Sequence, residues 1–154
     1  MESSCWNYKY EGSRILSKQY LAGFIDGEGY ISVIAHSDSR TKRGFTLQPV
    51  IAIGSVDKII LDEISKVTTG KFQSRKKIKN NKQLYALYIQ DLEGIRLCLN
   101  QILPYLIIKN QQATLLKEYI KLRLKNKNKG YSNRELEIAK LFKTINKRGQ
   151  SGSI

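Results

Sequence analysis

The stretch LAGFIDGEG, Leu21–Gly29, decides the fold of this 154-residue chain. It follows Ser17, whose hydroxyl can accept hydrogen bonds from the free amides at the start of a helix, so a helix is predicted from Ser17 to Gly27. Gly23 and Gly27 are four residues apart and therefore share one face of that helix. Because each glycine in a helix costs about 1 kcal/mol relative to alanine, this spacing indicates a face that a second backbone approaches closely.

Two acidic residues, Asp26 and Glu28, stand where this helix is predicted to end. Carboxylates at a helix C-terminus oppose the helix dipole and lower stability unless a cation is nearby. Hard oxygen ligands of this kind favour Mg²⁺ or Ca²⁺. A glycine-stopped helix with incidental acids is the alternative, and the nine residues alone leave both interpretations open.

Outward from this motif, apolar periodicity predicts two further units of two strands and a helix. The predicted strands are residues 30–36, 45–53, 72–78 and 84–89. The predicted later helices are residues 57–67, 91–103, 109–125 and 132–146. The order α-β-β-α-β-β-α with two C-terminal helices predicts an α+β fold, in which helices cover one face of an antiparallel sheet. One domain is expected at 17–148, with an N-terminal arm (1–16) and a disordered tail (149–154).

The charge of the chain predicts a polyanionic partner, since 27 Lys and Arg against 13 Asp and Glu give a net charge of +14. If Phe72 points into the core, alternation places its basic and polar neighbours on the open face of the sheet. Such side chains can contact base edges in a major groove, which admits a two-stranded ribbon, although plain solvation of the face is the alternative. The loop cations Arg40, Lys42 and Arg43 are expected to contact phosphates. The residues predicted to face DNA are Tyr30, Ser32, Ile34, His36, Arg40, Lys42, Arg43, Thr46, Gln48, Lys71, Gln73, Arg75, Lys77, Lys79, Gln83 and Tyr85.

Several classes of protein are disfavoured by composition. Two cysteines far apart in sequence exclude a disulfide scaffold and favour a reducing compartment. A single histidine, His36, gives little support to a His-rich metal site or a catalytic triad. No apolar run reaches the ~20 residues of a membrane span, and the first residues match neither a signal nor a transit peptide. We expect an intracellular protein, bacterial, archaeal or organellar, with no membrane partner.

The nine-residue motif resembles the signature of the LAGLIDADG homing endonucleases, with similar residues at the three departures, Phe24, Gly27 and Glu28. The resemblance continues in PYLIIKNQQ, Pro104–Gln112, which is similar to the segment bearing the family's active-site lysine. Residues 131–149 resemble the closing helix of single-motif members. The resemblance implies an αββαββα core whose saddle-shaped antiparallel sheet faces DNA.

The resemblance also implies sequence-specific cleavage of DNA by a homodimer, because only one copy of the motif is present. Two motif helices would cross closely at an interface made of Leu21, Gly23, Phe24 and Gly27. The implied target is a long, nearly palindromic duplex, since a two-fold axis maps one half-site onto the other. The implied product is a staggered double-strand break that initiates intron mobility.

Matched residue by residue, the resemblance implies that Glu28 is the metal ligand, assisted by the carbonyl of Gly27, while Asp26 supports the helix end. Lys109 would stabilise phosphate charge or polarise the solvent around the nucleophilic water. Ser55 lies near the position where the family often orders that water with Gln or Asn, so the chain departs from the pattern there. Mg²⁺ is the implied cofactor, with Mn²⁺ or Ca²⁺ as substitutes for binding. An intron RNA maturase and a DNA-binding regulator that no longer cuts are the alternatives.

Overall fold

A computed structural model describes residues 16–74 and 83–150, with side chains as far as Lys147. The elements in chain order are α1 (Lys18–Glu28), β1 (Gly29–Ser37), β2 (Phe45–Ser55), α2 (Lys58–Ser65), β3 (Lys71–Ser74), β4 (Tyr85–Ile89), α3 (Leu92–Ile102), the short 3-10 helix η2 (Leu103–Tyr105), α4 (Asn110–Lys125) and α5 (Asn133–Gln150). This order confirms the predicted α+β class and the αββαββα core with two C-terminal helices. The second half of the predicted strand 72–78, its turn and the outer parts of both termini lie outside the described residues.

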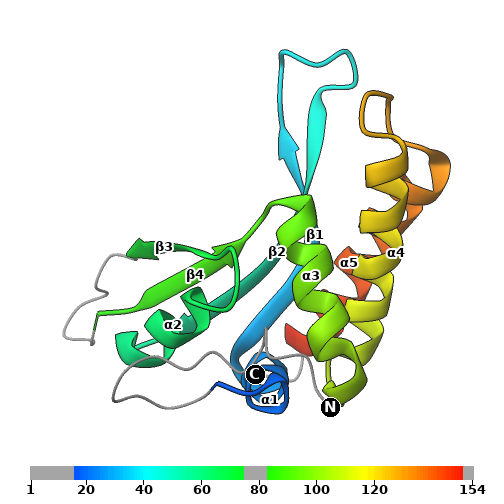
Figure 1. Ribbon diagram of the computed structural model, residues 1–154. Coiled ribbons are helices and arrows are strands. Elements are labelled where there is room, and N and C mark those ends of the chain that lie inside the picture. Colours follow the sequence, from blue (N-terminus) through cyan, green and yellow to red (C-terminus); the bar gives the residue numbers. More distant parts are fainter. Residues whose placement is uncertain (1–15, 75–82, 151–154) are drawn as a thin grey trace.

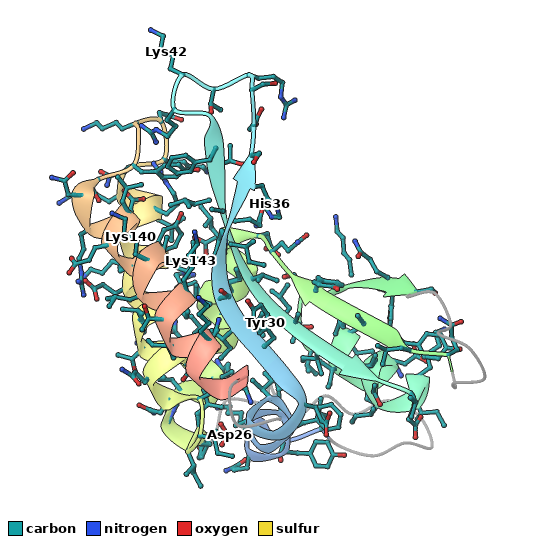
Figure 2. All side chains as sticks on the ribbon, turned by 180° about the vertical axis from the view of Figure 1, so that it is seen from behind. Asp26, Tyr30, His36, Lys42, Lys140 and Lys143 are labelled. Atoms are coloured by element: carbon teal, nitrogen blue, oxygen red, sulfur yellow. The ribbon has the colours of Figure 1, made fainter. Side chains whose placement is uncertain are left out.

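The four strands form one antiparallel sheet in the order β1-β2-β4-β3. Helices α2 and α3 lie in front of the sheet in Figure 1, and α4 and α5 stand together beside its edge strand β1. The strands come to the front in the reverse view of Figure 2. The sheet therefore has a covered face and an open face, as predicted. The hairpin of β1 and β2 extends to the end of the molecule opposite α1 (Figure 1).

Local hydrogen bonds start the helices where the sequence predicts. The side chains of Ser17, Asp57 and Asp91 accept from the backbone N–H of Tyr20, Ile59 and Gly94, respectively. Ser132 and Glu135 form a reciprocal capping box, in which each side chain accepts from the other residue's N–H. The starts of α1, α2, α3 and α5 are thus fixed within three residues of sequence.

Helix ends depart further from prediction than helix starts. Helix α2 ends at Ser65, two residues early, while α5 continues to Gln150 instead of ending near Asn146. Lys147 and Arg148 are good helix formers, and Gly149 carries only a propensity cost, so nothing local stops the last helix. Helix α3 ends at Ile102, and Pro104 lies in η2, as a proline stop requires.

The core lies between the covered face and the helices, and its strand residues are Ile31, Val33, Leu47, Ile51, Ile53, Leu87 and Ile89. Helix α5 crosses to β1, where the Asn146 side chain donates to the carbonyl oxygen of Ile31. No helix in the described ranges is both long and apolar enough to span a bilayer.

Candidate active site and DNA interface

The open face is organised in rows that the strand register defines. One row runs Tyr30–Ala52–Tyr88–Lys71 across the four strands, and the next is Gly54–Ala86–Gln73. Further rows pair Ile34 with Gln48 and His36 with Thr46 toward the tip of the hairpin. In Figure 2, Asp26, Tyr30, His36 and Lys42 follow one another from α1 to that tip. The open face thus extends from the end of α1 along the whole β1–β2 ribbon.

This face encloses a hollow of about 370 Å³, which begins at Glu28. Predicted DNA-facing residues that line it are Tyr30, Ile34, His36, Gln48 and Gln73. Thr46 and Lys71 share the open face through their cross-strand partners His36 and Tyr88. The polar side chains of the β1–β2 ribbon therefore lie on the face that would meet base edges if the ribbon entered a major groove.

One DNA-facing prediction is wrong, and a second residue is less accessible than expected. Ser32 has the open-face register predicted for it, opposite Val50, but it is only 4% exposed. Tyr85 packs against the core, since it lies on the same side of β4 as Leu87. Tyr88 instead occupies the open face, and the sequence already contained this signal, because alternation from a buried Leu87 puts Tyr88 outward.

The three loop cations between β1 and β2 differ in their surroundings. Arg40 is bound bidentately by Asp38, with Nε to Oδ1 at 2.9 Å and Nη2 to Oδ2 at 3.1 Å. This guanidinium lowers the pKa of Asp38. Lys42 stands at the tip (Figure 2), and Arg43 lies over the ring of Tyr131. The predicted cations Arg75, Lys77 and Lys79 lie outside the described residues, and Gln83 lies two residues before the start of β4.

A groove of about 780 Å³ runs between the outer edge of β1 and helix α5. Tyr30 and Ile34 line it from the open face, and Lys143 and Lys147 line it from α5. Positive charge of the C-terminal helix therefore flanks the open face.

The end of α1 brings the candidate catalytic groups together. Glu28 is exposed at the last helical position and lines the hollow. The chain turns tightly from α1 into β1 at the next residue, Gly29. This turn requires a glycine, because a Cβ on residue 29 would lie 2.6 Å from the carbonyl oxygen of Ile25. The ammonium of Lys109 donates to the backbone carbonyl of Asp26, so it is held at the same helix end.

Asp26 joins two segments that are far apart in sequence. Its carboxylate is 8% exposed and accepts hydrogen bonds from the N–H of Ile107 at 2.7 Å and of Lys109 at 3.0 Å. Burial on its own would raise the pKa of Asp26. Hydrogen bonds from the backbone of residues 107–109 and the charge of Lys109 outweigh that effect, so this pKa lies below its ordinary value. Asp26 therefore positions Lys109 at the end of α1, the helix whose last residue is Glu28.

We expect Asp26→Asn to lower the free energy of unfolding by about 2–3 kcal/mol, because the amide cannot accept both charge-assisted hydrogen bonds. The depressed pKa stabilises the wild type above the ordinary pKa of about 4 and stops doing so as the pH falls through the folded value. The wild type should therefore lose its advantage over the variant in acid. Urea unfolding at neutral and acidic pH measures both effects. Asp62→Asn, at a half-exposed carboxylate on α2, is the control and should change stability by less than about 0.5 kcal/mol.

A family model described as "LAGLIDADG endonuclease" matches residues 21–122, well over half of the chain. The chain belongs to the LAGLIDADG endonuclease family. Its LAGLIDADG motif, Leu21–Gly29, forms most of α1 and the first residue of β1. No curated protein matches the sequence.

Solved LAGLIDADG structures share the fold. The archaeal intron-encoded homing endonuclease I-Vdi141I, solved with DNA, is 20% identical with a TM-score of 0.70, over 82% of each chain. I-CvuI, solved with the I-CreI target in the presence of Mg, is 23% identical with a TM-score of 0.66, over 84% of this chain and 79% of that one. The meganuclease I-CpaMI, bound to uncleaved DNA, is 25% identical with a TM-score of 0.66 over 79% of this chain, which spans only 40% of I-CpaMI.

The LAGLIDADG helix has one face that none of the described residues covers. A Cβ added at Gly23 or Gly27 would meet nothing within 4 Å, so neither glycine is required by the packing of one chain. Phe24 is half-buried and stacks with the exposed Tyr20 at 6.4 Å between ring centroids. Leu21 is fully buried in the core, so its prediction as an interface residue is wrong: it occupies the opposite side of the helix.

The geometry does not support Ser55 as the residue that orders water in this LAGLIDADG site. Its hydroxyl accepts from the N–H of Asp57 at 3.0 Å and starts the turn into α2. Gly54, one residue earlier, lines the hollow instead. Alternation along β2 therefore puts a residue without a side chain at the open-face position.

The donors at the end of α1 fit a hard divalent cation. Glu28 offers an exposed carboxylate, and the last helical carbonyls, including that of Gly27, carry the negative end of the helix dipole. Within residues 16–74 and 83–147, no three His, Cys, Asp or Glu side chains cluster as metal ligands. Among the described residues, one chain thus offers a single exposed carboxylate at the end of α1, that of Glu28.

Proposed function

We propose that the protein is a homing endonuclease that makes a Mg²⁺-dependent staggered break in a long, nearly palindromic duplex. The observation that carries this proposal is the placement of Glu28 and Lys109 at one helix end, where the open face begins. The polar rows of that face and its flanking cations give the surface that a duplex needs. The DNA complexes of I-Vdi141I and I-CvuI support the same use of the fold.

The active species is a homodimer in this proposal. The uncovered face of α1 at Gly23 and Gly27 lets a second α1 cross closely, and a two-fold axis there places two Glu28 carboxylates together. Each chain then covers one half-site. Four exposed apolar residues supply further surface for a partner chain: Val56, Ile59, Ile107 and Ile108.

Each residue has a defined task in hydrolysis. Divalent ions, when bound, supply an activated water and stabilise the charge of the leaving oxygen. Glu28 and the carbonyl of Gly27 hold such an ion. Lys109, fixed by Asp26, places positive charge near the scissile phosphate. The open face positions the duplex, so that the phosphate of each strand arrives at one helix end.

Selection of cleaved sites from a randomised duplex library tests the proposal. With Mg²⁺ or Mn²⁺ the purified chain should release products with staggered ends from a family of nearly palindromic sites, and EDTA should stop the reaction. Ca²⁺ should support binding. Tight, sequence-specific binding without cleavage in any divalent metal would contradict the proposal and favour a DNA-binding regulator.

A further inference from the structure

A second basic site lies between the β1–β2 loop and the α4–α5 loop, at the end of the sheet opposite α1 (Figure 1). It is a pocket of about 440 Å³, which we call the loop pocket. Among the described residues, its lining includes no acidic residue and five cations: Lys42, Arg43, Arg123, Lys127 and Lys129. Such a charge set favours an anionic ligand.

Tyr131 forms the rigid base of the loop pocket. The guanidinium carbons of Arg43 and Arg123 lie 4.7 Å and 4.8 Å from its ring centroid. Its hydroxyl accepts from the N–H of Leu47 on β2 at 2.9 Å. These contacts tie the α4–α5 loop to the hairpin, so the cations of two separate segments are held together.

Of the two arginines that line the loop pocket, Arg43 is the one available to a ligand. Among arginines with described side chains, the others pair with carboxylates: Arg40 with Asp38, Arg96 with Glu93, Arg123 with Glu135, and Arg134 with Glu118 and Glu137. No described carboxylate pairs with Arg43. A Cβ on Gly130 would lie 2.5 Å from its Nη2, so the glycine makes room for the guanidinium. Arg43 is therefore held in place without a counter-ion, as a preformed phosphate site requires.

The loop pocket borders Phe45 and Thr46, at the start of β2. This outer part of β2 pairs with β1 but not with β4, because the pairing with β4 begins only at Ile51. When a two-stranded ribbon enters the major groove, the phosphate backbones that bound the groove run along its edges. We propose that the loop pocket binds a backbone phosphate of DNA at the outer end of each half-site. This inference rests on the proposed function, because it assumes that the open face holds a duplex.

The test measures how the affinity for duplex DNA depends on salt, using a duplex of arbitrary sequence that is longer than the target. Arg43→Ala/Lys129→Ala should reduce the slope of log K against log salt concentration by about 0.9 per lost phosphate contact, or about 1.8 for a dimer with two pockets. Lys117→Ala/Lys121→Ala removes two exposed lysines from α4 away from the pocket and should leave the slope nearly unchanged. Circular dichroism confirms that each variant is folded.

Gly130→Ala separates a shaped site from general positive charge. It keeps every charge but displaces the guanidinium of Arg43, so the slope should fall in this variant as well. An unchanged slope in both Arg43→Ala/Lys129→Ala and Gly130→Ala would overturn the proposal. Variants that lost affinity only for structured RNA, and not for duplex DNA, would also overturn it. Because the probe is not cleaved, failure of the wild type to cut any duplex would count against the proposed function and leave this measurement interpretable.

Discussion

Glu28→Gln is expected to lower the cleavage rate by on the order of 10³-fold while the affinity for DNA in EDTA changes by less than about threefold. The substitution keeps the shape of the side chain but removes the negative charge that binds the metal ion. Glu28 is exposed and accepts no described hydrogen bond, so the fold does not depend on its carboxylate. Single-turnover cleavage and an equilibrium binding assay on the selected target measure the two quantities.

Glu93→Gln is the matched control, because it makes the same chemical change at an exposed carboxylate on α3. This variant should cut at the wild-type rate. Cleavage by Glu28→Gln within tenfold of wild type would remove Glu28 from the metal site.

Gly23→Leu is expected to weaken dimerisation by about 10²-fold or more and to abolish double-strand cleavage with it. Among the residues that the structure describes, nothing lies within 4 Å of a Cβ at position 23, so the monomer should fold and gain about 1 kcal/mol from helix propensity. In a homodimer the two-fold axis brings both leucines into the crossing point of the helices, where overpacking separates the backbones. Analytical ultracentrifugation and urea unfolding measure the two effects.

Thr114→Leu places the same side chain on an exposed position of α4 and should leave a dimer that cleaves. A Gly23→Leu protein that still sediments as a dimer and cuts both strands would show that the chains associate through a different surface.

Local chemistry makes much of this structure predictable. The caps at Ser17, Asp57 and Asp91 need only a hydroxyl or carboxylate within three residues of a free amide. Two-residue alternation along each strand is sufficient to put Tyr30, His36, Gln48 and Gln73 on the open face, where all four line the hollow. The motif also indicates where Glu28 and the two glycines stand, because helix periodicity depends on spacing alone.

The errors arise where neighbours distant in sequence decide the environment. Ser32 has the alternation of an open-face residue, yet the surrounding side chains bury it. The error at Tyr85 is of another kind, because alternation from the buried Leu87 already puts Tyr88, and not Tyr85, on the open face. Periodicity gives the side of an element but not what covers it.

The sequence by itself determined the order of the elements, the faces of the strands and the end of the LAGLIDADG helix, because these follow from interactions between residues close along the chain. Only the tertiary structure decided that Asp26 fixes residues 107–109, and with them Lys109, at the helix end that carries Glu28. It likewise decided that Tyr131 joins the C-terminal loop to β2 and holds Arg43. Contacts across more than eighty residues depend on how whole elements pack, which no local pattern specifies.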